Sequence, residues 1–214
     1  DLIVVGSRAA GLSVALATGG LLRVAVVSRG VSGLDGASCW AQGGVAAAIG
    51  PGDSPGQHAA DTINAGQRLN NKSAVRWLAE SAPDVVRWLM SIGMQFDVVN
   101  GRLALGREAA HSFPRILHAG GDATGAELAR ALRDAVARQP WIERLEFTEA
   151  CEILKHGNQV VGVHARNRRG ELIRLLAPSV VLATGGVGQL YRYTTNPVES
   201  DGSGLALAHW AGAE

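Results

Sequence analysis

The sequence predicts an α/β fold in which a parallel sheet is combined with a three-stranded antiparallel β-meander and with helical insertions. A wholly apolar run, Leu2–Val5, is typical of a strand buried on both faces of a parallel sheet. A second apolar run, residues 23–28, follows a glycine turn and a helical segment, as in a βαβ unit. A third, residues 179–186, ends in a glycine pair and is expected to return to the same sheet.

The first βαβ unit, residues 1–30, has the character of a nucleotide-binding fold. Its expected helix, residues 9–17, begins shortly after a tight turn at Gly6. Free backbone N–H groups and the positive end of the helix dipole therefore meet at one point, which attracts a diphosphate. The pattern predicts a Rossmann-like dinucleotide-binding half-fold.

The glycine fingerprint of such folds, G-x-G-x-x-G, is imperfect in this chain. Arg8 stands where the middle glycine lets the backbone approach a pyrophosphate, and the second strand ends in Ser28-Arg29 without the usual acidic residue. From this motif alone, a βα turn in another kind of α/β protein stays open. A guanidinium also matches phosphate oxygens, but because the approach is to the backbone, we expect Arg8→Gly to strengthen binding.

The composition limits the class of protein. The chain has 214 residues, 47% of them hydrophobic, and a net charge of +1 with scattered Lys and Arg, so no nucleic-acid partner is expected. Cys39 and Cys151 form neither a disulfide framework nor a metal cluster, which favours a reducing, cytoplasmic location. No apolar run reaches transmembrane length, so no membrane partner is expected. The ends of the sequence suggest a fragment.

The middle of the chain is expected to contain a long loop and then helices. Residues 31–56 form a glycine- and serine-rich loop, in which Trp40 is expected to be buried. Residues 57–140 are predicted to be mainly helical, with helices over 58–69, 73–92 and 124–138. Pro83 is expected to split the second helix, with Ser81 as the N-cap of its second half.

Strands return after Pro140. The β-meander, residues 145–177, is predicted from three strands over 145–155, 159–165 and 171–176, separated by turn residues. The returning strand, residues 179–186, would bring Thr184 and Gly185 to the edge of the sheet where ligands bind in open α/β folds.

The stretch between residues 107 and 125 is the richest in chemically active side chains. It holds two histidines, two arginines and two acids, without metal-ligand spacing. Glu108 and His111 could bind a dicarboxylate or move protons. From their spacing alone, a solvated loop that caps a helix is an equally open interpretation.

Eight motifs in order resemble the L-aspartate oxidases of the succinate dehydrogenase/fumarate reductase flavoprotein family. The resemblance extends over nearly the whole chain. The motifs are residues 6–11, 28–30, 40–44, 107–112, 115–118, 122–125, 182–186 and 194–197.

This resemblance implies FAD as cofactor, and it implies that residues 31–56 form the FAD loop. It implies that the diphosphate lies at Gly6, Ser7, Arg8, Ala9, Ala10 and Gly11, and the adenosine near Ser28 and Arg29. It implies that the isoalloxazine lies against Ala37, Ser38, Cys39, Trp40, Ala41, Gln42, Gly43 and Gly44, with Thr184, Gly185 and Ser203 as further cofactor contacts. Since Ala37 replaces the histidine that links FAD in the dehydrogenase and reductase subunits, the cofactor is expected to be noncovalent.

The reaction implied is the FAD-dependent oxidation of L-aspartate to iminosuccinate, the first step of de novo NAD (pyridine nucleotide) biosynthesis. Electrons pass to oxygen or fumarate, and quinolinate synthase is a possible downstream partner. Glu108 is implied to orient the substrate amine, with His111 nearby. The capping and C-terminal helical domains and the carboxylate-binding cations come later in the family's sequences, so this segment alone is expected to be inactive.

Two alternatives accompany this interpretation. The first is a fumarate reductase or succinate dehydrogenase-type flavoprotein. The second is a non-catalytic fragment with impaired FAD binding, suggested by three departures from the family. They are Arg8, Ala109-Ala110 in place of a Gly-Gly pair that reaches positive φ easily, and Ser203, which stands in Gly202-Ser203-Gly204 where the family has Gly-Asp-Gly.

Overall fold

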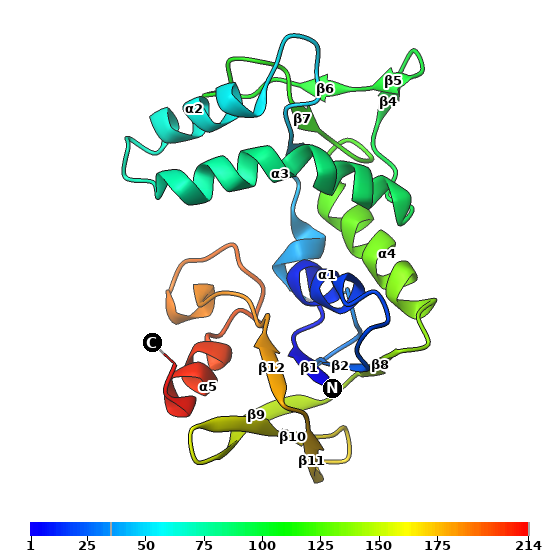
Figure 1. Ribbon diagram of the computed structural model, residues 1–214, viewed down its shortest axis with the longest axis vertical. Coiled ribbons are helices and arrows are strands. Elements are labelled where there is room, and N and C mark those ends of the chain that lie inside the picture. The colour runs from blue at the N-terminus through cyan, green and yellow to red at the C-terminus, as the bar shows by residue number, and fades with distance from the viewer. Residues whose placement is uncertain (35, 214) are drawn as a thin grey trace. The chain divides into compact units, whose positions relative to one another are not determined.

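The computed structural model describes residues 1–34 and 36–213, which form two compact units. The first unit consists of residues 1–40 and 128–214, and the second of residues 41–127. Figure 1 labels the helices and strands of both units. No helix within the described residues is both long enough and apolar enough to cross a membrane.

The first unit is built on a four-stranded sheet of order β12-β1-β2-β8, in which all neighbours are parallel. Its strands are β1 (Leu2–Val5), β2 (Val24–Val27), β8 (Ile142–Leu145) and β12 (Ser179–Leu182). The predicted parallel sheet is therefore confirmed, including the return of β12 to the side of β1 (Figure 1). All four residues of β1 are buried, as the continuous apolar run predicted.

Strand β8 corrects the sequence-based prediction of one strand over residues 145–155. The chain instead leaves the parallel sheet at Leu145, turns through Phe147 at φ +53°, and starts a new strand at Glu149. The N–H of Thr148 donates to the carbonyl of Ser28 at 2.8 Å within this turn. Strand β8 lies at the edge of the sheet, and its two central residues, Glu143 and Arg144, are exposed. It therefore lacks the apolar run from which the other parallel strands were predicted.

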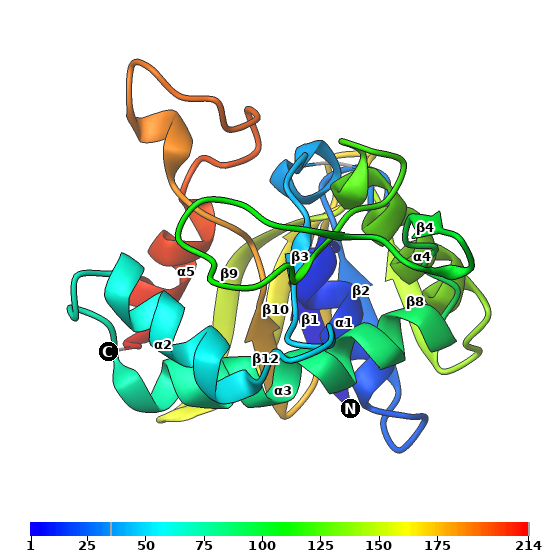
Figure 2. The same ribbon diagram turned by 90° about the horizontal axis from the view of Figure 1, so that it is seen from above.

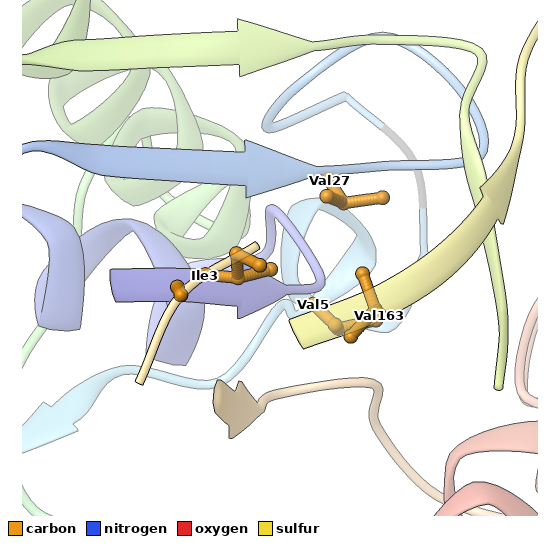
Figure 3. Packing of buried hydrophobic residues seen from close by; sticks show 5 residues of the cluster. Ile3, Val5, Val27 and Val163 are labelled. Atoms are coloured by element: carbon orange, nitrogen blue, oxygen red, sulfur yellow. The ribbon is translucent and has the colours of Figure 1, made fainter. Parts of the chain in front are cut away.

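The antiparallel meander is confirmed, with strand order β11-β10-β9. Its strands are β9 (Glu149–His156), β10 (Gln159–Arg166) and β11 (Leu172–Leu176). Val163 of β10 packs with Ile3, Val5 and Val27 of the parallel sheet, and Figure 3 shows these side chains in one apolar cluster. Burial of this shared cluster holds the two sheets together.

The helices of the first unit connect or cover these sheets. α1 (Ala9–Ala17) joins β1 to β2, and α4 (Thr124–Ala137) places Leu132 and Val136 in the core. α5 (Ser203–Ala211) contacts β9, where the Lys155 Nζ donates to the Ala211 carbonyl at 2.7 Å. Two short 3₁₀ helices, η1 (Ala37–Trp40) and η2 (Gly188–Leu190), complete the unit.

The second unit contains two helices and small antiparallel sheets. α2 (Pro55–Ala65) and α3 (Lys72–Ser91) lie side by side in both views (Figure 2). The short strands, which the predicted helical region did not include, form sheets of order β3-β7-β6 and β4-β5. These strands are β3 (Val45–Ala46), β4 (Val98–Val99), β5 (Arg102–Leu103), β6 (Leu105–Gly106) and β7 (Ile116–Leu117).

Two local predictions in the middle of the chain are wrong. Pro83 does not split the second helix, because α3 runs without interruption from Lys72 and is capped by the side chain of Asn71, not Ser81. The burial of Ala79, Val86 and Leu89 along α3 outweighs the local cost of proline. Trp40, expected to be buried, is 74% exposed.

Candidate functional site

The turn after β1 forms an anion-binding cradle in the first unit. Gly6 has φ +110°, a conformation that only glycine adopts readily, and a Cβ there would overlap the carbonyl of Ala183 after β12. A Cβ at Gly11 would overlap the carbonyl of Gly6, so α1 crosses the turn at the closest possible distance. Both glycines of the outer fingerprint are therefore required by geometry.

The N-terminus of α1 offers hydrogen-bond donors to a ligand. Arg8 occupies the N-cap position with φ −85° and ψ −173°, and its side chain makes no capping hydrogen bond. Among the residues that the structure describes, no side chain accepts a hydrogen bond from the first-turn N–H groups of Ala9, Ala10 and Gly11, at the positive end of the helix. An anionic diphosphate fits these donors, and no side chain of the cradle is acidic.

A cavity of about 60 Å³ adjoins the cradle at the carboxyl ends of β1, β2 and β12. It brings together residues that were predicted from four separate segments. Those in its lining are Gly6, Ser7, Arg8, Ser28, Arg29, Thr184 and Ser203. The sequence did not indicate Thr148, Glu149, Glu199 or Leu207, which also line it.

Arg29 is tied to a carboxylate at one side of this cavity. Its Nη1 lies 2.6 Å from Asp201 Oδ2, and its Nη2 donates to the Glu199 carbonyl at 2.7 Å. The hydrogen bond with Arg29 is the main cause that holds the pKa of Asp201 well below its usual range. The same carboxylate accepts from the Ser203 N–H at 3.0 Å, at the first turn of α5.

The contact between Asp201 and Ser203 concerns one departure from the pattern of the family that the sequence resembles. Ser203 takes the position of the family's aspartate, and its N–H is held by Asp201, the carboxylate two residues earlier. The side chain of Ser28 is also engaged, since its Oγ donates to the Gly30 carbonyl at 2.7 Å.

A second cavity of about 350 Å³ lies on the other side of Arg8 in the same unit. Ala37 and Ser38 of η1 and Gly185 line it together with the start of α5. Cys39 donates its thiol to the carbonyls of Leu34 and Gly36 at 3.1 Å. Ala41, Gln42, Gly43 and Gly44 belong to the second unit, where the Gly125 N–H donates to the Ala41 carbonyl at 2.8 Å.

A buried charge cluster lies in the second unit and centres on Arg115, whose side chain is fully buried. Two parallel hydrogen bonds of 2.8 Å join its guanidinium to the carboxylate of Asp53. Its Nη1 donates to Asp61 Oδ2 at 2.7 Å. These contacts raise the pKa of Arg115, with the hydrogen bond to Asp53 as the largest cause.

Asp61 also receives the backbone N–H and the hydroxyl of Ser112, at 2.8 Å and 2.7 Å. Burial by itself raises the pKa of this carboxyl, but the hydrogen bonds from Ser112 and Arg115 outweigh burial and lower the pKa to about 2. The carboxylate form of Asp61 therefore persists over the whole physiological range.

The cluster fixes the orientation of His111. Arg115 Nη1 lies 3.2 Å from His111 Nδ1, and because a guanidinium only donates, Nδ1 must accept. The remaining ring nitrogen, Nε2, then carries the proton of the neutral imidazole. His58 packs beside it, with ring centroids 5.9 Å apart, and burial is the first cause that lowers the pKa of His58.

Glu108 lies on an exposed loop of the same unit. Its carbonyl accepts from the His111 N–H at 3.2 Å, and its Oε1 lies 3.9 Å from His118 Nε2. Ala110 adopts φ +69°, so this loop reaches a positive φ even though alanine replaces glycine there. The structure thus brings Glu108 near His118 and links it through a turn to His111.

The sequence missed most of the partners in this cluster. Asp53 and Asp61 are 62 and 54 residues from Arg115 along the chain, and no local pattern connects them. Within residues 1–34 and 36–213, no group of three or more His, Cys, Asp or Glu side chains could hold a metal ion.

Comparison with known proteins agrees with the interpretation of the turn after β1 as a cofactor-binding cradle. The family model described as "FAD binding domain" matches residues 1–214. The L-aspartate oxidase of Streptomyces coelicolor is 46% identical over 100% of this chain and 38% of its own length. That of Agrobacterium fabrum is 44% identical over 99% of this chain and 40% of its own. The chain thus spans about two fifths of the length of these relatives.

Solved structures show the same fold. The Mycobacterium smegmatis Sdh1 complex in its apo form superimposes with a TM-score of 0.92 at 33% identity, covering 99% of this chain and 38% of that one. E. coli quinol fumarate reductase FrdA, with an E245Q mutation, gives a TM-score of 0.92 at 29% identity, covering 97% and 36%.

The cofactor indicated by the family is FAD, and the uncapped helix, Gly6 and the neighbouring cavity fit its diphosphate. The similarity to L-aspartate oxidases concerns the amino-terminal part of those enzymes. The chain therefore belongs to the family of FAD-binding domains that the L-aspartate oxidases and the succinate dehydrogenase and fumarate reductase flavoproteins share.

Proposed function

We propose that this chain is the FAD-binding part of an L-aspartate oxidase, which converts L-aspartate to iminosuccinate and passes electrons to oxygen or fumarate. The observation that carries the proposal is the cradle of Gly6, Gly11 and the uncapped α1, in a chain 46% identical to such an enzyme. The product would enter pyridine nucleotide biosynthesis, with quinolinate synthase as the next enzyme, in the cytoplasm.

The residues of the first unit would bind the cofactor. The first-turn N–H groups of α1 would donate to the diphosphate, Ser28 and Arg29 would lie at the adenosine, and residues 37–40 at the flavin. Residues 41–44, which belong to the second unit, would also contribute to the flavin site. Bound FAD supplies an acceptor for the hydride that leaves the substrate Cα. With Ala37 in the place of a linking histidine, FAD would be held noncovalently.

The residues of the second unit would bind the substrate. The exposed carboxylate of Glu108 would accept hydrogen bonds from the α-ammonium group and orient the Cα–H bond. His111 can present only Nε2 to a ligand, because Arg115 occupies Nδ1. It would therefore donate a hydrogen bond to a carboxylate of the dicarboxylic acid.

The test of this role uses the full-length protein that contains this segment. Glu108→Gln should lower kcat/KM for L-aspartate by about tenfold or more, since a hydrogen bond to a charged group contributes about 1.5–3 kcal/mol. Glu80→Gln, at an exposed position of α3, is the matched control. Hydrogen peroxide release measures turnover, and flavin absorbance checks the cofactor. Equal turnover in the two variants would remove Glu108 from the site.

Two other functions are distinguished by simple measurements. The fold shared with E. coli fumarate reductase favours, as the second candidate, reduction of fumarate by the full-length protein. Acid precipitation should leave FAD in the supernatant if the cofactor is noncovalent, whereas yellow colour in the pellet would favour the reductase type. A chain that binds no FAD under any condition would be the non-catalytic fragment.

A further inference from the structure

Arg8 extends its side chain between two glycine backbones of the first unit. A Cβ built on Gly36 would overlap the Nε and Cζ atoms of Arg8, and a Cβ built on Gly185 would lie 2.5 Å from its Nη1. The guanidinium thus fills a notch that exists only because both positions are glycine. Gly36 is buried, so the notch lies inside the unit and not on its outer surface.

The two cavities of the first unit meet at this side chain. The cavity of about 60 Å³ and the cavity of about 350 Å³ have three lining residues in common, Arg8, Ala183 and Thr184. Ala183 and Thr184 lie along the chain after β12, and Arg8 is the only one of the three with a long side chain. Its side chain therefore forms the wall that separates the cavities.

The diphosphate of a dinucleotide would lie at the start of α1, where Arg8 stands between the two cavities. We propose that the Arg8 side chain divides one cofactor groove into two compartments and weakens FAD binding until it leaves its notch. This inference rests on the proposed function, because it assumes that the groove binds FAD.

Two effects of Arg8 oppose each other. A displaced guanidinium could pair with a diphosphate, which would strengthen binding. However, the same atoms occupy the volume between the compartments, and moving them exposes the notch at Gly36 and Gly185. The backbone N–H groups of α1 already supply donors for an anion, so the guanidinium of Arg8 adds little further attraction. The volume that the guanidinium occupies, in contrast, is not available to the cofactor. The steric effect therefore dominates.

The backbone at residue 8 makes glycine a clean substitution. Its φ of −85° and ψ of −173° are open to any residue, so Arg8→Gly removes the side chain without relieving backbone strain. Arg8→Met keeps most of the length and removes the charge. The pair of variants therefore separates volume from charge.

The experiment is a flavin-fluorescence titration of the chain and both variants with FAD at one salt concentration, after circular dichroism has confirmed folding. We expect Arg8→Gly to lower the Kd at least tenfold, or ~1.4 kcal/mol. Arg8→Met should bind FAD no more tightly than the unaltered chain. Arg8→Ala, which also opens the wall, replaces the glycine variant if that variant does not fold.

The outcomes separate this inference from the proposed function. Weaker binding in both Arg8→Gly and Arg8→Met would identify Arg8 as a phosphate ligand and overturn the inference. Tighter binding in Arg8→Met would mean that charge, not volume, opposes the cofactor, and would overturn it as well. If neither the chain nor any variant binds FAD, the proposed function fails instead.

Discussion

Arg115 and Arg8 lie inside different units, and the surroundings of their guanidinium groups are opposite. Arg115 is fully buried and meets two carboxylates and an imidazole of its own unit. Arg8 is half-buried at the positive end of α1, and within the described part of the chain its guanidinium has no hydrogen bond or ion pair. The cluster around Arg115 is complete without a ligand, whereas the region around Arg8 retains unused donors and an adjoining cavity.

The two arginines differ in whether the charge of the guanidinium group is compensated. A buried cation stabilises a fold only when carboxylates and hydrogen bonds replace the water it has lost. Arg115 satisfies that condition and also contacts His111, on the loop that carries Glu108. Arg8 does not satisfy it, so its side chain is free to move when an anion arrives.

The largest expected effect follows from breaking the buried cluster. Arg115→Met would leave Asp53, whose side chain is fully buried, without its cation, and should cost about 3–5 kcal/mol of unfolding free energy. Arg8→Met is the matched control and should change the unfolding free energy by less than about 1.5 kcal/mol, because methionine keeps most of the length of the side chain and leaves no buried carboxylate unpaired. Urea unfolding measures both variants. A similar loss in the two would contradict the distinction between them.

A smaller loss of unfolding free energy is expected at acidic pH. Because the pKa of Asp61 is about 2 in the folded state and 3.8 in its ordinary state, the ionised form stabilises the fold fully above about pH 4. That contribution, on the order of 2 kcal/mol, is lost as the pH falls through about 2. Asp61→Asn should remove this part of the acid dependence in thermal melts between pH 5 and 2.

Asp84→Asn provides the control for Asp61, because the carboxylate of Asp84 pairs with Arg87 on the exposed surface of α3. Exposed pairs contribute little, so this variant should keep the acid dependence of the unaltered chain. An acid loss in Asp84→Asn that is equal to or shallower than that in Asp61→Asn would show that burial in the cluster is not the cause.

The smallest expected effect concerns the loop between Glu108 and His111. Ala110 adopts φ +69°, which costs an L-residue roughly 1–2 kcal/mol, so Ala110→Gly should stabilise the chain by about 0.5 kcal/mol after the greater unfolded-state entropy of glycine is counted. Ala109→Gly, at a residue without positive φ, should instead destabilise by about 0.5–1 kcal/mol. Thermal melting of the pair measures both, and equal shifts would refute the strain at Ala110.

Local patterns were sufficient for the framework of the first unit. The apolar runs at Leu2–Val5 and residues 179–186 predicted strands of one parallel sheet, and Gly6 and Gly11 predicted the cradle. The meander also followed from its turn residues, because turn chemistry depends on only a few adjacent residues. The ordered motifs were sufficient for the family, which the whole-chain match confirms.

Residues close together along the chain were therefore enough to predict β1, β2, β12, the meander, the cradle and the FAD-binding family. Contacts formed on folding explain why α3 continues through Pro83, why β8 joins the parallel sheet, and why Trp40 is exposed. Folding also placed Asp53 and Asp61 on Arg115, and the side chain of Arg8 between Gly36 and Gly185. Such contacts join residues far apart in the chain, and their free energy comes from burial and charge compensation that exist only after folding.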